Sequence, residues 1–214
     1  MEEQAVEIVS SLINQYIESL YPVEHDVQIE MEQLAKRRQF PIVGPQVGRL
    51  LAWLVRSANA KRVLELGSGF GYSAFWFCSA LGADGEITLT DHSAGNLKEA
   101  KRLLEKANRL SQLQFITGDG VAYLSGATGK FDIIFNDIDK RDYPTVIEPA
   151  AARLRPGGLF ITDNALWYGS VVRVGSTDPA IDGVVQFNQT IFAHPQFEAI
   201  LLPIRDGVVV ARRR

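Results

Sequence analysis

The sequence predicts an α/β fold: a mostly parallel, seven-stranded sheet with helices before it and an antiparallel hairpin strand at its end. Three observations predict this class. Apolar residues recur at helical spacing over positions 1–60, short apolar runs alternate with helical stretches from Lys61 onward, and an Asp-Gly turn separates the last two runs. We expect one domain over 1–214, with a helical segment at 1–60 and the α/β core at 61–214.

Three apolar stripes predict helices within the helical segment 1–60. They run over Val6–Leu20, Ile29–Ala35 and Val47–Val55. Pro22 ends the first helix, and Phe40-Pro41 separates the second from the third.

Five short apolar runs predict parallel strands, because helical stretches connect them. The runs are Arg62–Leu66, Glu86–Thr90, Leu113–Thr117, Phe131–Asn136 and Gly158–Thr162. The connecting helices are expected at Tyr72–Leu81, Gly95–Ala107, Val121–Leu124 and Tyr143–Leu154. Two further runs, Phe197–Pro203 and Val208–Arg212, flank Ile204–Gly207. Asp-Gly between apolar runs is typical of a hairpin, so the last strand should be antiparallel to its neighbour.

Composition excludes several classes of protein. With 22 Lys and Arg against 25 Asp and Glu, the net charge of −3 gives no global attraction to nucleic acid or to anionic membranes. The single cysteine, Cys78, excludes an internal disulfide and a multi-cysteine zinc cluster. No apolar run approaches the roughly 20 residues of a membrane span. The acidic start, Met1–Gln4, lacks the basic region of a secretory signal, so a cytoplasmic location without membrane contact is expected.

A glycine-rich turn follows the first predicted strand and leads into a helix. Its spacing is G-x-G-x-G over Gly67–Gly71, whereas a dinucleotide-binding loop needs G-x-G-x-x-G, and position 72 is tyrosine. The spacing therefore argues against a nicotinamide dehydrogenase. Asp91 follows the second predicted strand, at a distance along the chain where a carboxylate can accept from ribose hydroxyls.

Polar residues also follow the fourth and fifth predicted strands. Asn136–Lys140 and Asp163-Asn164 should face one crevice, because the carboxyl ends of parallel strands meet there. Two carboxylates and an amide oxygen are hard ligands that suit Mg²⁺, with Mn²⁺ or Ca²⁺ as alternatives. Turns and helix caps use the same residue types, which leaves a structural interpretation open.

Six segments in order resemble one family: VLELGSGFGYSA (63–74), LTDH (89–92), GDG (118–120), FNDIDK (135–140), ITDNALWYGS (161–170) and IRDGVVVARR (204–213). They are similar to the metal-dependent class I O-methyltransferases of the catechol and caffeoyl-CoA group, which includes small bacterial members. The resemblance runs from about Phe40 to the C-terminus. It implies a Rossmann-like methyltransferase fold and S-adenosylmethionine as methyl donor.

The resemblance also implies roles for individual residues. The residues matching cofactor-binding positions are Val43, Glu65, Gly67, Ser68, Ser73, Asp91, Gly120, Asp137 and Asp139. Those matching the metal ligands are Asp137, Asp163 and Asn164, and Lys140 matches the general base beside the catalytic Asp137. Tyr168 replaces an asparagine that contacts substrate in the plant caffeoyl-CoA enzymes, which argues against a caffeoyl-CoA acceptor. Trp167 is a candidate wall for the acceptor ring, and a buried tryptophan at the domain edge is the alternative interpretation.

The chemistry then follows from the acceptor. A phenol has a pKa near 10, so a cation that stabilises the phenolate and a nearby lysine base would both assist its deprotonation. Two adjacent hydroxyls would chelate the cation, which favours a small catechol-like acceptor. A homodimer is expected from the resemblance and from the apolar N-terminal helices.

Two further hypotheses use the same cofactor. Some short bacterial members of this family methylate a tRNA hydroxyuridine, and Lys36–Arg38, Lys61-Arg62 and Arg212–Arg214 could contact phosphates. The net charge of −3 argues against RNA as the substrate. A non-catalytic S-adenosylmethionine-binding protein would be expected to lack Lys140 or the Asp and Asn residues, and this sequence retains them.

Overall fold

Seven strands form one sheet in the order β3-β2-β1-β4-β5-β7-β6. The computed structural model describes residues 6–22, 25–173 and 177–214. The strands are β1 (Arg62–Leu66), β2 (Glu86–Asp91), β3 (Leu113–Thr117), β4 (Phe131–Asn136), β5 (Leu154–Thr162), β6 (Phe197–Leu202) and β7 (Val208–Arg213). All seven predicted strands are present, and β5 begins at Leu154 rather than at the predicted Gly158.

The pairing of the strands confirms a mostly parallel sheet. β1 pairs in parallel with β2 and β4, and β4 with β5, whereas β7 is antiparallel to both β5 and β6. The Asp-Gly turn therefore joins an antiparallel hairpin, as predicted. Strand order reverses between β1 and β4, and at such a point the carboxyl ends of the strands border a natural binding crevice.

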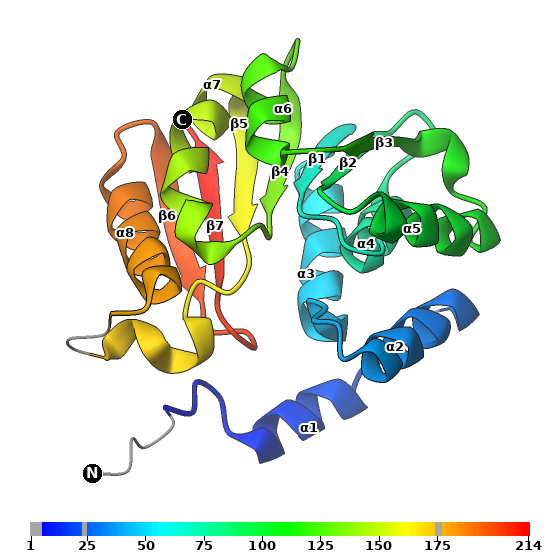
Figure 1. The fold of residues 1–214 in the computed structure, drawn as a ribbon, viewed down its shortest axis with the longest axis horizontal. Helices are drawn as coiled ribbons and strands as arrows, with labels where there is room; N and C mark the ends of the chain where they lie inside the picture. Colours follow the sequence, from blue (N-terminus) through cyan, green and yellow to red (C-terminus); the bar gives the residue numbers. More distant parts are fainter. Residues whose placement is uncertain (1–5, 23–24, 174–176) are drawn as a thin grey trace.

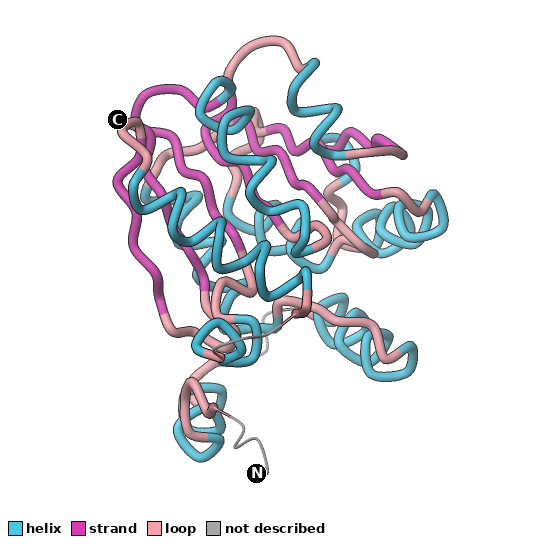
Figure 2. Tube along the Cα trace, turned by 60° about the vertical axis from the view of Figure 1, so that its left-hand side comes forward, coloured by secondary structure: helices cyan, strands magenta, loops and turns pink. Residues whose placement is uncertain are grey.

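Helices cover both faces of the sheet (Figure 1). One face carries α3 (Gly44–Ser57), α4 (Tyr72–Ala80) and α5 (Ala94–Lys106), and the other carries α6 (Gly120–Gly126), α7 (Ile147–Arg153) and α8 (Pro179–Ala193). Each layer buries its own apolar core against the sheet. Figure 2 shows the same layers in a second view, with the strands between the helices.

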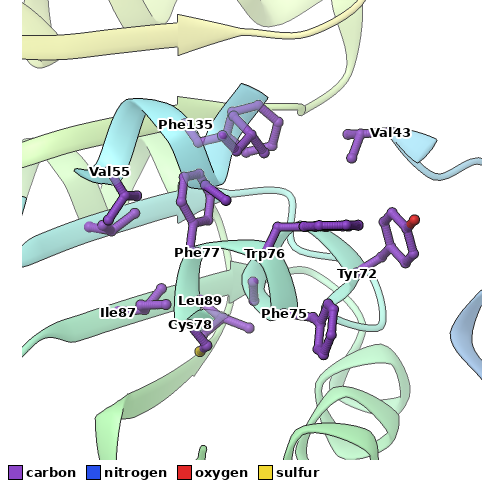
Figure 3. Close-up of a cluster of buried hydrophobic side chains, with 14 of the residues drawn as sticks. Val43, Val55, Tyr72, Phe75, Trp76, Phe77, Cys78, Ile87, Leu89 and Phe135 are labelled. Atoms are coloured by element: carbon purple, nitrogen blue, oxygen red, sulfur yellow. The ribbon is translucent and has the colours of Figure 1, made fainter. Parts of the chain in front are cut away.

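The core beside α4 fixes the helix that follows the glycine-rich turn (Figure 3). Trp76 and Phe77 are fully buried, and the Phe77 ring lies 5.7 Å from that of Phe135 on β4. Cys78 is buried in the same cluster, as expected for a small apolar side chain. Burial raises the pKa of the Cys78 thiol to about 12, which disfavours its reactive thiolate form.

The N-terminal helices differ in their packing. α2 (Asp26–Arg38) buries Met31 and Leu34, whereas α1 (Ser11–Ser19) has no buried residue and lies apart from the sheet (Figure 1). The predicted start at Val6 is wrong, because residues 6–10 precede the helix and Glu7 instead accepts a hydrogen bond from the Ser11 N–H. The apolar stripe of this segment predicts a longer helix than the local contacts support.

Two expectations for the second half also need correction. The helix expected over Tyr143–Leu154 is a 3₁₀ helix, η2 (Lys140–Val146), followed by α7, and Pro144 lies within the 3₁₀ part. α8 is absent from the predicted elements, although Asp178 and Pro179 form a typical helix start, with the Asp178 side chain accepting from the Ala180 N–H. Two further 3₁₀ helices are η1 (Leu110–Gln112) and η3 (Trp167–Val172).

Within the described part of the chain, every helix is too short or too polar to cross a bilayer.

Candidate active site

A cavity of about 1510 Å³ opens at the carboxyl ends of β1, β2, β4 and β5. The predicted site residues come together in this cavity from loops that are separate in the sequence. Those that line it are Val43, Gly67, Ser68, Ser73, Asp91, Gly120, Asp137, Asp139, Lys140, Asp163, Asn164, Trp167 and Tyr168. Glu65 is the exception, since it is fully buried behind the wall.

The glycine loop, residues 67–71, forms one side of the cavity. The Gly67 and Ser68 N–H groups donate to the Thr90 carbonyl at 3.1 and 2.9 Å, which ties the loop to the end of β2. Gly67 has φ +81°, and a Cβ there would lie 2.4 Å from the carbonyl oxygen of Asp137. Glycine is thus required for the loop to approach the residue that follows β4.

Asp91 fixes the glycine loop from the end of β2. Its Oδ2 accepts from the Gly69 N–H at 2.9 Å, and its Oδ1 accepts from the Ser93 N–H at 2.7 Å. The carboxylate is half-buried on the cavity wall and retains lone pairs for a further donor. This position fits the predicted contact with ribose hydroxyls.

Open space lies beside the adjoining turn that begins α6. Gly118 lines the cavity, and a Cβ built on it would meet no atom within 4 Å. Gly120 is buried, and a Cβ there would lie 2.6 Å from Thr90 Oγ1, so this position has room for glycine alone. The backbone of this turn can therefore lie directly against a flat ligand.

Glu65 and Ser73 form a buried pair behind the loop. The Ser73 hydroxyl donates a hydrogen bond to Glu65 Oε1. Burial raises the pKa of the Glu65 carboxyl to about 8, although the Ser73 hydrogen bond opposes the shift. Ser73 also lines the cavity, so its hydroxyl can turn to an anionic ligand group.

Asp137 and Lys140 lie together at the end of β4. Lys140 Nζ is 2.8 Å from Asp137 Oδ1 and 3.2 Å from the carbonyl oxygen of Ile138. Burial raises the pKa of the Asp137 carboxyl, although the Lys140 charge opposes the shift. Lys140 Nζ also lies 5.5 Å from the centre of the Trp167 ring.

Asp163 is the most deeply buried carboxylate that lines the cavity, with 3% of its surface exposed. The Tyr143 hydroxyl donates to its carbonyl at 2.9 Å, and Oδ1 has no hydrogen-bond partner among the described residues. Burial and the neighbouring charge of Asp137 raise the pKa of the Asp163 carboxyl to about 7. A cation would offset the repulsion between the Asp137 and Asp163 carboxylates and would give the unpaired Oδ1 a partner. These carboxylates therefore fit a divalent metal.

The donor set at this end has two carboxylates and one amide. Asn164 follows Asp163 directly and lines the same cavity. Among the described residues, no group of three or more His, Cys, Asp and Glu side chains is arranged to hold a metal. The predicted set remains chemically suitable, because its third ligand is the amide oxygen of an asparagine.

Three predicted residues lie at the outer rim of the cavity. Asp139 is exposed and ion-paired with Arg141, whose hydrogen bond lowers the pKa of the Asp139 carboxyl to about 2. Trp167 is half-buried and Tyr168 is 66% exposed, with their rings 5.3 Å apart. The two rings form one wall of the opening.

Arg205 and Asp206 reach the cavity from the turn between β6 and β7; they lie in the segment 204–213 that carries part of the resemblance, but no role was predicted for them. Arg205 Nη1 donates to the carbonyl of Ile42 at 2.7 Å, next to Val43. The Asp-Gly signal predicted only a turn. Since β7 lies beside β5, this turn lies against the loop that carries Asp163 and Asn164.

The three basic segments considered for RNA do not share one surface. Lys36 lines the cavity, and Arg37 and Arg38 follow it at the end of α2. Lys61-Arg62 lies at the start of β1, and Arg212–Arg214 lies at the end of the antiparallel β7. Both segments therefore lie at the amino ends of the parallel strands, whereas the cavity lies at the carboxyl ends.

Comparison with known proteins gives one consistent family. The O-methyltransferase family model matches residues 19–214. A catechol O-methyltransferase from Niastella koreensis is 31% identical over 210 residues, covering 93% of this chain and 95% of that protein. A caffeoyl-CoA O-methyltransferase from Eucalyptus gunnii is 30% identical, with 95% and 88% covered. The crystal structure of an O-methyltransferase from Bacillus cereus in complex with SAH matches with a TM-score of 0.86 and 28% identity, covering 95% of this chain and 97% of that one.

Proposed function

The chain belongs to the O-methyltransferase family, and we propose that it moves a methyl group from S-adenosylmethionine to a hydroxyl of a small phenolic, catechol-like acceptor with the help of a divalent cation. The observation that carries this proposal is one cavity lined by both the glycine loop and the group Asp137, Lys140, Asp163 and Asn164.

The glycine loop and Asp91 would hold the methyl donor. Asp91 would accept from the ribose hydroxyls, Gly120 would lie beside the adenine, and Val43, Gly67, Ser68 and Ser73 would surround the methionine end. The open space at Gly118 and the complex of the Bacillus cereus relative with SAH support this assignment. S-adenosylmethionine supplies a methyl group that is bonded to a positively charged sulfur. The sulfur leaves as a neutral thioether, so it needs no acid from the protein.

Asp137, Asp163 and Asn164 would hold the cation, with Mg²⁺ the first candidate. When bound, the cation supplies positive charge that lowers the pKa of the acceptor hydroxyl. The unpaired Oδ1 of Asp163 and the raised pKa of its carboxyl support a cation here.

Lys140 would accept the proton of the acceptor hydroxyl. Its side chain is partly buried on the cavity wall, and its Nζ lies beside Asp137. In its neutral form the amine has a free lone pair for that proton, and its fixed place beside the proposed ligand positions it for the transfer. Trp167 and Tyr168 would bound an aromatic acceptor from the outer side.

The acceptor class is tested by a methyl-transfer assay with radiolabelled S-adenosylmethionine and Mg²⁺. Catechol, phenol and a tRNA that carries hydroxyuridine without a methyl group would be compared at equal concentration. We expect catechol to be methylated and phenol much more slowly, because only two adjacent oxygens can chelate a cation. Equal rates for catechol and phenol would contradict chelation.

The same assay addresses the tRNA hydroxyuridine alternative. Of the three basic segments, only Lys36–Arg38 lies on the cavity side of the sheet, so the other two lie away from an RNA bound at the site. Binding of tRNA that falls steeply with added salt, together with tRNA methylation, would favour the alternative over the catechol proposal.

We also propose that the protein is a homodimer. The exposed apolar side chains of α1 support this, since Leu12 and Tyr16 are 73% and 63% exposed. Sedimentation equilibrium should give twice the chain mass of 23.7 kDa. A single species at the chain mass would contradict the proposal.

A further inference from the structure

The turn between β6 and β7 lies against the loop 164–168 that follows β5. The Ala165 and Leu166 N–H groups donate to the carbonyls of Gly207 and Asp206, each at 2.9 Å. These backbone contacts join a segment directly after the proposed ligand Asp163 to a turn near the end of the chain.

The Asp206 carboxylate bridges two parts of that loop. Its Oδ2 accepts from Asn164 Nδ2 at 3.2 Å, and its Oδ1 accepts from the backbone N–H of Tyr168. When ionised, a carboxylate only accepts hydrogen bonds, so it must face the NH₂ side of the asparagine amide. The amide oxygen of Asn164 is thereby turned away from Asp206 and left available to another partner.

The loop needs such support because its backbone is strained. Asn164, Trp167 and Tyr168 have φ of +56°, +41° and +53°. Asparagine tolerates this left-handed region, whereas bulky aromatic residues are rare there. Strained residues persist only where surrounding contacts hold them, and Asp206 contacts both ends of this segment.

We propose that Asp206 is a positioning residue: it directs the amide oxygen of Asn164 toward the cation and holds Tyr168 as a wall of the acceptor site. The inference rests on the proposed function, because it assigns Asn164 to the cation. Asp206 itself does not contact the reacting atoms. It acts as the hydrogen-bonded outer partners of metal ligands do, whose loss weakens metal affinity about 10–100-fold.

A pair of substitutions separates positioning from simple structural support. In Asp206→Asn, one of the two acceptor oxygens becomes an NH₂ group, so the amide of Asn164 either loses its partner or turns its oxygen toward residue 206. Exchanging the two residues, Asp206→Asn with Asn164→Asp, restores both contacts with reversed polarity. The amide introduced at 206 still accepts from the Tyr168 N–H and now donates to the carboxylate introduced at 164, whose second oxygen stays free.

The measurement is the affinity for Mn²⁺ alone, obtained by counting free Mn²⁺ with electron paramagnetic resonance. We expect Asp206→Asn to bind Mn²⁺ about 10–100-fold more weakly than the wild type. The exchange variant should bind it at least as tightly as the wild type. Asp142→Asn is the matched control, because it removes one negative charge from the lining of the same cavity at η2 instead of at the β6–β7 turn, and its affinity should stay near wild type.

The outcomes separate this proposal from the proposed function. A wild type that binds Mn²⁺ no better than Asp163→Ala would contradict the cation itself, and with it the proposed function. Loss of Mn²⁺ in Asp163→Ala but unchanged affinity in Asp206→Asn would overturn only the role of Asp206. Calorimetry with S-adenosylhomocysteine checks that each variant is folded. If Asp206→Asn does not fold, an exchange variant that folds but binds Mn²⁺ weakly overturns the inference.

Discussion

The two sides of the cavity are built in different ways. The cofactor side, formed by the glycine loop and Asp91, is tied together by hydrogen bonds from Gly67, Ser68 and Gly69 to the end of β2. The proposed cation side, formed by Asp137, Asp163 and Asn164, receives a contact from a turn near the end of the chain, where Asp206 accepts a hydrogen bond from Asn164. Adjoining strand ends assemble both sides, and the second side is also held by a hairpin that is distant in the sequence.

Both sides hold buried oxygens without a partner among the described residues, Ser68 Oγ on the first and Asp163 Oδ1 on the second, but the two sides differ in their carboxylates. On the cofactor side, the Asp91 carboxylate already accepts three hydrogen bonds. On the cation side, Asp163 keeps an oxygen without a partner among the described residues, beside a second carboxylate, and the following loop is strained. We infer that the Asp91 carboxylate is already held in place before a cofactor binds, whereas the Asp163 carboxylate would be completed by the proposed cation.

Replacing Lys140 should give the largest loss on the cation side among single changes that spare the proposed metal ligands. Lys140→Ala should reduce kcat about 10²–10⁴-fold, the usual contribution of a general base. A higher pH should restore part of the rate, because more of the acceptor is then ionised in solution. Lys130→Ala is the control, because Lys130 directly precedes β4 and does not line the cavity. A loss in Lys140→Ala that stays constant with pH would argue for a purely structural role.

Replacing Asp91 should affect the cofactor side alone. Asp91→Ala should weaken S-adenosylmethionine binding by about 1–3 kcal/mol, because the ribose hydroxyls and the Gly69 N–H lose an acceptor. Calorimetry would measure this loss, and Mn²⁺ affinity should stay unchanged. Unaltered cofactor affinity would remove the ribose assignment, and a matching fall in Mn²⁺ affinity would contradict the independence of the two sides.

The third effect is a pH dependence of stability from Glu65, which concerns folding rather than binding or rate. Its carboxyl has a pKa of about 8 when folded and near 4.5 when unfolded, so between these values the folded state holds one more proton. The free energy of unfolding should therefore fall as pH rises, by about 1 kcal/mol per pH unit.

Urea unfolding of the wild type and of Glu65→Gln from pH 5 to 8 would measure this contribution. Glutamine mimics the protonated acid, so the variant should lose that part of the slope and be relatively more stable at pH 8. The Asp163 contribution is common to both proteins and cancels in the difference. Parallel stability curves would show that Glu65 does not titrate in this range.

Local patterns predicted most of the fold and the cofactor side. The strand runs, the G-x-G-x-G loop and Asp91 each lie within one short segment, so spacing alone identified them. The apolar spacing does not predict α8, although Asp178-Pro179 marks its start. The same spacing predicts too early a start for α1, because amphipathic spacing does not require a partner to pack against, and no residue of α1 is buried.

The support of the cation side could not be predicted from local patterns. Asp137, Asp163 and Asn164 were predictable because they follow strands directly, and the structure brings all three to one cavity. The contact between Asp206 and Asn164 exists only because β7 inserts between β5 and β6. A turn residue identifies a hairpin, but its tertiary partner depends on strand order, which no short motif encodes.

The dependence of the cation side on its metal is tested most directly by the rate of catechol methylation in EDTA at saturating S-adenosylmethionine. We expect EDTA to abolish turnover while cofactor affinity stays unchanged, and Mg²⁺ or Mn²⁺ to restore it, with Ca²⁺ restoring less because it is larger and less demanding in geometry. Asp163→Ala should remain inactive after Mg²⁺ is added back. Full turnover in EDTA, or in Asp163→Ala, would contradict this dependence and leave these residues as turn-forming only.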